Sequence, residues 1–396
     1  MGTLASGDWL TRERGLAVGW LCALTTIVAV AFLLATATGT LDRLGRPLGT
    51  DFSNVWTAGR MALEGRAADA WSWPEHFAVQ RALHGKEDVD LFGWHYPPPF
   101  LLVAAALATL PYLPALIAWQ LATLAPLTAL MWRLVPRRET LLATLAAPVT
   151  LVCLAHGHNG FLTALLLGGG LALLDRRPVA AGLLLGCLLY KPQFALIIPP
   201  LLLAGRHWRA IAGALLSSSL LVAATLAIWG WPVWQAFLDS LPLTRSVVIE
   251  QGATGWHKIM TPFAAARMWG AGVPLAYAAQ SLATLASIAA VVLLAWRRTR
   301  PDLRNALACA AVLVSTPYAL DYDFVVLLPA LAFLWRDGER SGWLPWDKSV
   351  MALAWTAPLV ARQVAEFTLL PLGLATAVAI GAIAVRRQLR ASPSRR

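Results

Sequence analysis

Charged residues are scarce in this sequence. Only 13% of its 396 residues are Asp, Glu, Lys or Arg, whereas 58% are hydrophobic and the mean hydropathy is +0.62. A soluble domain of this length needs more charge to cover its surface, so the composition predicts a chain embedded in lipid. The net charge of +11 does not indicate nucleic-acid binding, because the basic residues form short clusters between apolar runs.

Cysteine and lysine are scarce as well. The four cysteines all lie inside apolar runs: Cys22, Cys153, Cys187 and Cys309. None stands beside another in a loop, which argues against a disulfide framework or a cysteine-based metal site. There are also only four lysines, and two of them, Lys191 and Lys258, fall at turns among apolar residues. Ionisable groups near a membrane are costly, so these two lysines are functional candidates.

Short arginine clusters divide the chain into apolar stretches. The clusters fall at 12–14, 133–138, 176–177, 206–209, 297–304, 336–340 and 386–390. The apolar stretches lie near 16–38, 97–132, 140–155, 160–174, 178–190, 193–204, 210–229, 272–296, 304–316, 324–335, 349–361 and 368–385. Positive charge marks the cytoplasmic side of membrane proteins. The pattern therefore predicts an all-α polytopic membrane protein with about twelve membrane segments and both termini in the cytoplasm.

The first apolar run decides whether the N-terminus is a cleaved signal. Ala35-Thr36-Ala37 has the small residues of a cleavage site. However, the run is longer than the roughly 7–15 residues of a cleaved signal core. We expect an uncleaved signal anchor; a mature N-terminus near Thr38 would contradict this.

Several apolar stretches are too short to span a bilayer. About 12–15 residues make roughly 20 Å of helix, against a hydrocarbon core of about 30 Å. The short stretches come in pairs: 140–155 with 160–174, 178–190 with 193–204, and 304–316 with 324–335. The turn inside each pair must line a polar cavity, because lipid cannot satisfy its backbone groups. We therefore predict a recessed cavity that faces away from the cytoplasm.

Two longer loops lie on the same outward side, at about 39–96 and 230–261. Apolar residues recur at helical spacing in the first loop: Phe52, Val55, Trp56, Gly59 and Leu63. This spacing predicts an amphipathic helix lying on the membrane. Ser72 and Glu75 have the spacing of a capping box that opens a second short helix. No internal repeat or soluble domain is visible, so residues 1–396 form one integral membrane domain.

The polar residues gather at the outward turns. They are Asp51, His95, Tyr96, His156, His158, Asn159, Lys191, Gln193, His257, Lys258, Asp321, Tyr322, Asp323, Arg362 and Glu366. Asp51 is either an N-cap of the helix that follows it or a general base at the membrane surface. Lys191 either binds a lipid phosphate or extends its ammonium to the interface. His257, Lys258 and Arg245 are weaker candidates for the same anion.

The histidines and the two later acids leave further alternatives. His95, His156 and His158 do not have the spacing of a zinc site, so we expect them to hydrogen-bond a polar ligand, without a metal or other cofactor. Asp321 and Asp323 could bind a divalent cation with phosphate, contact sugar hydroxyls, or cap the helix that follows.

Four motifs, in order, resemble glycosyltransferase family 87. They are the run from Asp51 to Arg60, Tyr96-Pro97-Pro98-Pro99-Phe100, His156-Gly157-His158-Asn159-Gly160, and the Ala181 to Pro192 segment with Lys191. The family consists of GT-C-type membrane enzymes and includes mannosyltransferases that use polyprenyl-phosphate mannose. One departure is that relatives often carry His near the later outward turn, where this chain has acids between Ser315 and Asp323.

The resemblance implies a polyprenyl-phosphate sugar as donor, transfer outside the cytoplasm, inversion at the anomeric carbon and no required metal. By the same resemblance, Asp51 is the base and Lys191 holds the donor phosphate. The residues themselves, not the resemblance, make Lys258, His257 and Arg245 candidates to assist at the phosphate. The remaining candidates for substrate contact are His95, Tyr96, His156, His158, Asn159, Gln193, Asp321, Tyr322 and Asp323. The acceptor is a lipid or glycan, and the site faces the periplasm from the bacterial inner membrane.

Two other functions fit the same charged cavity. A transporter or lipid flippase would use it to move a lipid-linked or anionic sugar, although the sequence lacks the repeated halves common in transporters. A ligase or polymerase would transfer a whole glycan from a diphosphate lipid. The sugar itself, a mannose-like hexose or arabinofuranose, is left open by the sequence.

Overall fold

Five long apolar helices form the frame of the protein. The computed structural model describes residues 2–297 and 300–391. Among these residues, the helices long and apolar enough to cross a membrane are α2 (Arg12–Ala35), α6 (Tyr112–Leu134), α12 (Trp208–Trp229), α15 (Val273–Trp296) and α20 (Leu372–Ala391). Most of their apolar side chains face outward, as lipid-facing helices require. The described backbone contains no strand, only three isolated β-bridges. The all-α polytopic prediction is consistent with this architecture.

Shorter helices fill the space between the long ones. They are α5 (Pro99–Ala108), α7 (Arg138–Leu145), α8 (Pro148–His156), α9 (Gly160–Leu173), α10 (Pro178–Gly186), α11 (Ile198–Ala204), α16 (Pro301–Val314), α17 (Leu327–Ser341), α18 (Asp347–Thr356) and α19 (Ala361–Thr368). α7 and α8 bend by 47° and together make a sixth possible span. The predicted count of about twelve segments is therefore not confirmed. Arg298, from the 297–304 cluster, lies outside the described residues.

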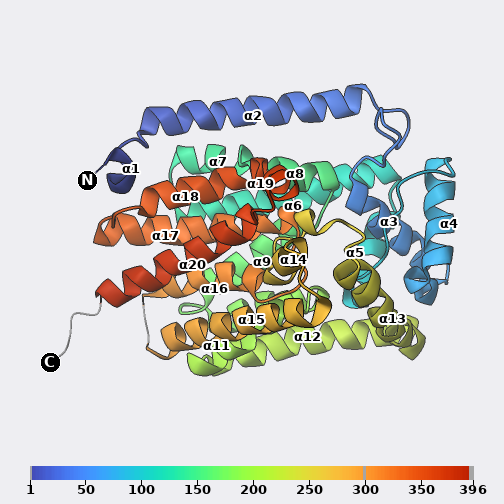
Figure 1. Ribbon diagram of the computed structural model, residues 1–396. Helices are drawn as coiled ribbons and strands as arrows, with labels where there is room; N and C mark the ends of the chain where they lie inside the picture. The colour runs from blue at the N-terminus through green and yellow to red at the C-terminus, as the bar shows by residue number, and fades with distance from the viewer. Residues whose placement is uncertain (1, 298–299, 392–396) are drawn as a thin grey trace.

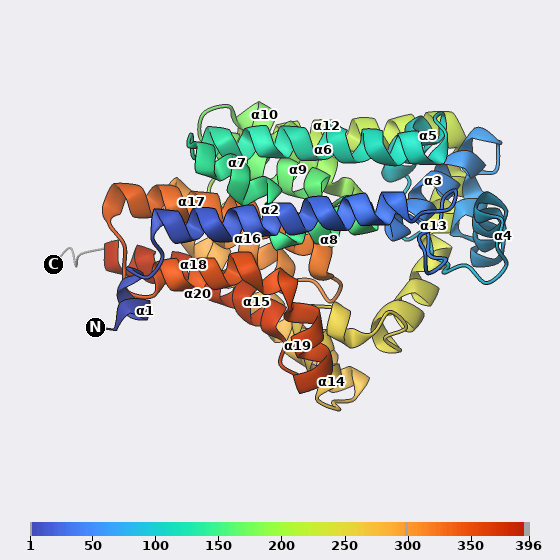
Figure 2. The same cartoon turned by 90° about the horizontal axis from the view of Figure 1, so that it is seen from above.

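Three loop helices gather at one end of the bundle (Figures 1 and 2). They are α3 (Thr50–Leu63), α4 (Trp73–His84) and α13 (Trp231–Thr244). The remaining helices are α14 (Pro262–Met268) and α1 (Thr3–Ser6). Short 3₁₀ or π turns complete the chain: η1 (Ala67–Trp71), η2 (Cys187–Tyr190), η3 (Phe194–Ile197), η4 (Arg245–Glu250), η5 (Trp256–Lys258), η6 (Asp321–Val326) and η7 (Ala357–Leu359). α3, α4 and α13 lie opposite to α1 and to the end of α20 (Figures 1 and 2). The first helix and the end of the last described helix thus lie at the same end of the bundle in both figures.

The helix predicted to lie on the membrane is α3. It packs closely on α5, where a Cβ at Gly59 would lie 2.0 Å from the backbone oxygen of Ala104. Its polar side chains Ser53, Asn54 and Thr57 are buried in protein instead of facing water. The structure therefore shows α3 packed in protein, while its position on the membrane stays a prediction, because apolar spacing alone does not distinguish contact with lipid from contact with protein.

The predicted capping box at the second loop helix does not form. α4 begins at Trp73, and the Ser72 side chain makes no cap hydrogen bond. Glu75 instead accepts a hydrogen bond from Arg66 Nη2 at 2.7 Å. The ion pair with the preceding turn draws the carboxylate away from the helix start.

The short paired helices bring their turns together. The turn between α8 and α9 packs against η6, which follows the turn after α16. The turn after η2 carries Lys191, which contacts Asp323 of η6. Residues from these turns are almost fully buried: His158, Asn159, Lys191, Asp321 and Asp323. The convergence of the three turns agrees with the pairing argument, while the recessed cavity itself stays a prediction.

Candidate functional site

The start of α3 presents Asp51 at the junction of the three turns. Gly49, with a φ of +66°, is the N-cap residue of α3, so Asp51 lies inside the first helical turn. The N-cap interpretation of Asp51 is therefore wrong. The Tyr112 hydroxyl donates a hydrogen bond to the carbonyl of Leu48 at 2.6 Å and fixes this helix start. The chain reaches Asp51 in a rigid, well-packed segment.

A glycine allows this segment to approach the α8–α9 turn. Gly157 has a φ of +62°, and a Cβ there would lie 2.6 Å from the Cβ of Phe52. Only a residue without a side chain permits this approach and this backbone conformation without strain. The contact places the α3 helix start against the turn that carries His156 and His158.

Asp51 combines burial with the absence of a hydrogen-bond partner. The residue is partly exposed, yet its Oδ2 is shielded from solvent and accepts no hydrogen bond from the part of the chain that the structure describes. Burial raises the pKa of Asp51 to about 6; the charge on His156 opposes this rise, and the nearby Asp321 adds to it. A carboxylate with a raised pKa near neutrality is suited to accept a proton.

A buried ion pair lies beside this carboxylate. Lys191 Nζ is 2.6 Å from Asp323 Oδ1, and both side chains are almost fully buried. Asp323 Oδ2 also accepts the backbone N–H of Leu320 at 3.0 Å, so the capping interpretation of Asp323 is confirmed. Asp321 Oδ1 accepts the N–H of Tyr322 at 2.9 Å. The acids that depart from the family pattern thus have internal partners.

Aromatic and amide groups complete the same junction. The rings of His158 and Tyr322 stack with centroids 3.6 Å apart, and the Tyr96 hydroxyl lies 3.4 Å from His158 Nε2. His156 Nδ1 hydrogen-bonds the carbonyl of Val152 at 2.8 Å. Buried polar atoms without a partner include His158 Nδ1 and both side-chain polar atoms of Asn159. Buried groups of this kind usually find a partner, so they are available to a polar ligand.

Two predicted phosphate-binding residues lie at the edge of the junction. His257 and Lys258 form part of η5 and are both partly buried. Burial lowers the pKa of Lys258, and the positive charge of Arg362 lowers it further, whereas Asp321 raises it. η5 therefore brings cationic groups toward the acid turn.

Three predicted site residues are not joined to the junction. His95 Nδ1 lies 2.9 Å from the hydroxyl of Thr244 in α13. Arg245 is exposed and pairs with Glu250 at 3.3 Å. Gln193 is partly exposed and makes no side-chain hydrogen bond in the described part of the chain. The described residues also contain no group of three or more His, Cys, Asp or Glu side chains that could hold a metal ion.

Sequence reasoning missed two residues of α3. Asn54 Oδ1 and Thr57 Oγ1 are buried and have no hydrogen-bond partner. They follow Asp51 at intervals of three residues, so all three share one helix face. Polar residues at this spacing in an otherwise apolar helix were the signal that would have identified them.

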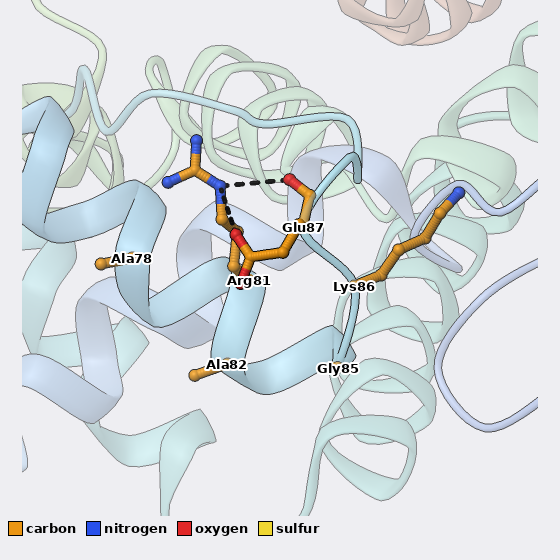
Figure 3. Close-up of a pocket in the computed structure, with 6 residues that line it drawn as sticks. All are labelled: Ala78, Arg81, Ala82, Gly85, Lys86 and Glu87. Atoms are coloured by element: carbon orange, nitrogen blue, oxygen red, sulfur yellow. Dashed lines mark hydrogen bonds and ion pairs between the residues drawn. The ribbon is translucent and has the colours of Figure 1, made fainter.

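A separate surface depression lies on the first outward loop (Figure 3). It is lined by Ala78, Arg81, Ala82, Gly85, Lys86 and Glu87. Its charges are matched, because Arg81 lies 3.8 Å from Glu87 and Lys86 lies 3.6 Å from Asp88. The depression shares no residue with the junction around Asp51.

Comparison with known proteins gives one match. A family model described as glycosyltransferase family 87 matches residues 94–317. No curated protein and no solved structure matches the chain. The matched region contains Tyr96, His158, Lys191 and Lys258, whereas Asp51 precedes it and the acids of η6 follow it.

Proposed function

The chain belongs to glycosyltransferase family 87 and is a membrane glycosyltransferase, and on this premise we propose that it moves a single sugar from a polyprenyl-phosphate carrier to an extracytoplasmic lipid or glycan acceptor. The reaction inverts the anomeric carbon, and Asp51 is the general base. The protein lies in a bacterial inner membrane with both termini in the cytoplasm and its site toward the periplasm.

The state of the Asp51 carboxylate carries this proposal. Asp51 Oδ2 is shielded from solvent and has no hydrogen-bond partner among the described residues. Burial raises the pKa of Asp51 to about 6, the charge of His156 opposes this rise, and the charge of Asp321 adds to it. A structural carboxylate in a protein interior is normally satisfied by hydrogen bonds or a paired cation. Among the described residues, Asp51 Oδ2 has no such partner, so this oxygen is available to accept the proton of an incoming hydroxyl.

The chemistry needs one proton acceptor and a group that stabilises the leaving phosphate. The acceptor hydroxyl attacks the anomeric carbon, the new C–O bond forms as the C–O bond to phosphate breaks, and the leaving phosphate takes the electron pair. Asp51 takes the hydroxyl proton, and cations stabilise the charge that develops on phosphate. Among the candidates, Lys258 and His257 have no acid at ion-pair distance in the described chain.

The unpartnered groups near Asp51 suit sugar hydroxyls. Asn159 offers a donor and an acceptor, and His158 Nδ1 offers one more polar atom beside the Tyr322 ring. An aromatic face and fixed polar atoms together are suited to orient a sugar ring. We therefore assign Asn159 and His158 to substrate contact, together with Tyr96 and Tyr322.

The proposal is tested by product analysis. Purified protein in proteoliposomes receives a panel of polyprenyl-phosphate sugars with lipid extract from its host, and mass spectrometry identifies the products. The expected result is an acceptor mass increased by one hexose or one pentose. Accumulation of the sugar lipid without a covalent product would instead establish a transporter or flippase, and transfer of a whole glycan from a diphosphate lipid would establish a ligase.

A further inference from the structure

The position of Lys258 is fixed by a backbone bridge. Ile259 and Leu320 form an isolated antiparallel β-bridge, and the N–H of Met260 donates to the carbonyl of Ala319 at 2.8 Å. Residues next to a bridge face each other across an antiparallel pair. Lys258 directly precedes this bridge and Asp321 directly follows it, and the charge of Asp321 acts on Lys258. Lys258 therefore lies at the border of the junction that contains Asp51.

A second cation reaches this border from the C-terminal part of the chain. α19 packs against η5, and Arg362 lies in the first turn of α19. After burial, the positive charge of Arg362 is the largest influence on the pKa of Lys258, and it lowers that pKa. Two cations from distant parts of the sequence thus belong to elements that pack together, and their charges influence each other.

Within the described residues neither of these two cations has an ion-pair partner, whereas three almost fully buried cations do. Lys191 pairs with Asp323 at 2.6 Å, Arg304 with Asp175 at 2.8 Å and Arg387 with Asp337 at 2.7 Å. Lys258 and Arg362 are partly buried, and within residues 2–297 and 300–391 neither has a carboxylate at ion-pair distance.

Three acids act on Lys258 without forming an ion pair with it. The charges of Asp321, Glu366 and Asp51 raise the pKa of Lys258, but within the described residues none of these carboxylates lies at ion-pair distance from Lys258 or Arg362. Glu366, one turn further along α19, is also exposed to solvent. Neighbouring like charges in a partly buried place repel each other, and an anion bound between them would remove that repulsion.

We infer that Lys258 and Arg362 together bind the phosphate of the lipid-linked donor, and that Lys191 holds Asp323 in place instead of binding phosphate. This inference rests on the proposed function, because it takes the anion to be a polyprenyl phosphate. Lys191 is then a positioning residue: its ammonium is taken by Asp323, whose other oxygen caps η6.

Two cations suit the change in charge during transfer. The phosphate of a polyprenyl-phosphate sugar is a diester with one negative charge, whereas the released polyprenyl phosphate is a monoester carrying about −1.5 to −2 at neutral pH. A second cation therefore stabilises the leaving group more than the bound donor. Removing Arg362 is expected to weaken binding of polyprenyl phosphate and to slow the transfer step, with a smaller effect on the KM for the donor.

The test measures binding of a short-chain polyprenyl phosphate to the purified full-length protein in detergent micelles by calorimetry. Arg362→Gln and Lys258→Gln are each expected to raise the Kd about ten-fold or more, since each removes a charge-assisted contact. The matched control is Arg81→Gln, which removes one outward-loop guanidinium that already lies near Glu87 (Figure 3). The control is expected to keep the wild-type Kd within about two-fold.

A double variant tests the role given to Lys191. Lys191→Met with Asp323→Asn removes both charges together and is expected to keep the wild-type Kd for polyprenyl phosphate. A loss of affinity comparable to that of Arg362→Gln would overturn this role and make Lys191 a phosphate ligand.

The outcomes separate this inference from the proposed function. If the wild type binds the probe and both glutamine variants bind it equally well, the two-cation site is refuted while the donor class survives. If the wild type does not bind polyprenyl phosphate at all, the proposed donor class itself fails. If inorganic phosphate or phosphatidylglycerol displaces the probe at matching concentration, the cations form a general anion surface and the inference is also refuted.

Discussion

Replacing the proposed base should make the protein more stable at alkaline pH. Burial raises the pKa of Asp51 from 3.8 to about 6. A shift of roughly two pKa units corresponds to roughly 3 kcal/mol of free energy. Because the folded-state pKa lies above the unfolded one, the folded protein binds the proton more tightly. The carboxyl therefore costs nothing at pH values below the unfolded pKa of 3.8; its destabilising effect grows as the pH rises from there to about 6 and stays constant above the folded pKa.

Asp51→Asn mimics the protonated carboxyl at every pH. We expect this variant to be more stable than the wild type by about 3 kcal/mol at pH 8 and by less than about 1 kcal/mol at pH 4. The measurement is the free energy of unfolding in mixed micelles, obtained by titration with a denaturing detergent at both pH values. Asp69→Asn, at an exposed carboxylate paired with Arg66, is the control and should show little pH-dependent gain. Equal stability of Asp51→Asn and wild type at pH 8 would refute the reasoning.

Three further predictions follow from the same geometry. The transfer rate should rise with pH through about 6 and then level off, because Asp51 must be deprotonated to act as base; an acid limb near pH 4 in the pH–rate profile would contradict this. Lys191→Met should destabilise the fold by about 3–5 kcal/mol, because it leaves Asp323 buried and unpaired. The double variant Lys191→Met with Asp323→Asn should lose much less stability. The free energies of unfolding of both variants test this, and equal losses would refute the coupling. Gly59→Ala should displace α3 and abolish folding or activity, since its Cβ would lie 2.0 Å from a backbone oxygen of α5. Gly169→Ala would make only an ordinary contact at 3.5 Å and should be tolerated. The expression level and monodispersity of the two variants test this difference.

Much of the architecture could be predicted from composition and charge. The apolar runs and arginine clusters identified the long helices, although the single apolar stretch at 97–132 forms two helices, α5 and α6, separated at Pro111. The number of spans could not be predicted, because short apolar helices buried between longer ones have the same composition as true spans. Likewise, the burial of α3 against α5 depends on Gly59, and such a contact is not visible in a hydrophobic pattern.

The candidate site was predicted in part. The turns of the short helix pairs do meet, so Asp51, His158, Asn159, Lys191 and the η6 acids share one junction. The partners inside that junction could not be predicted, because the Lys191–Asp323 pair joins residues 132 positions apart. For the same reason, the sequence did not indicate that the elements carrying Arg362 and Lys258 would pack together.

The central claim is that Asp51 takes the proton of the acceptor hydroxyl during sugar transfer. The most direct measurement is the single-turnover transfer rate of the wild type, Asp51→Asn and the Asp69→Asn control in proteoliposomes, with the donor that gives product and with folding confirmed for each protein. General-base catalysis contributes about 10²–10⁴-fold. The account predicts a rate loss of that size for Asp51→Asn alone, with polyprenyl phosphate still bound. Near wild-type transfer by folded Asp51→Asn would contradict it.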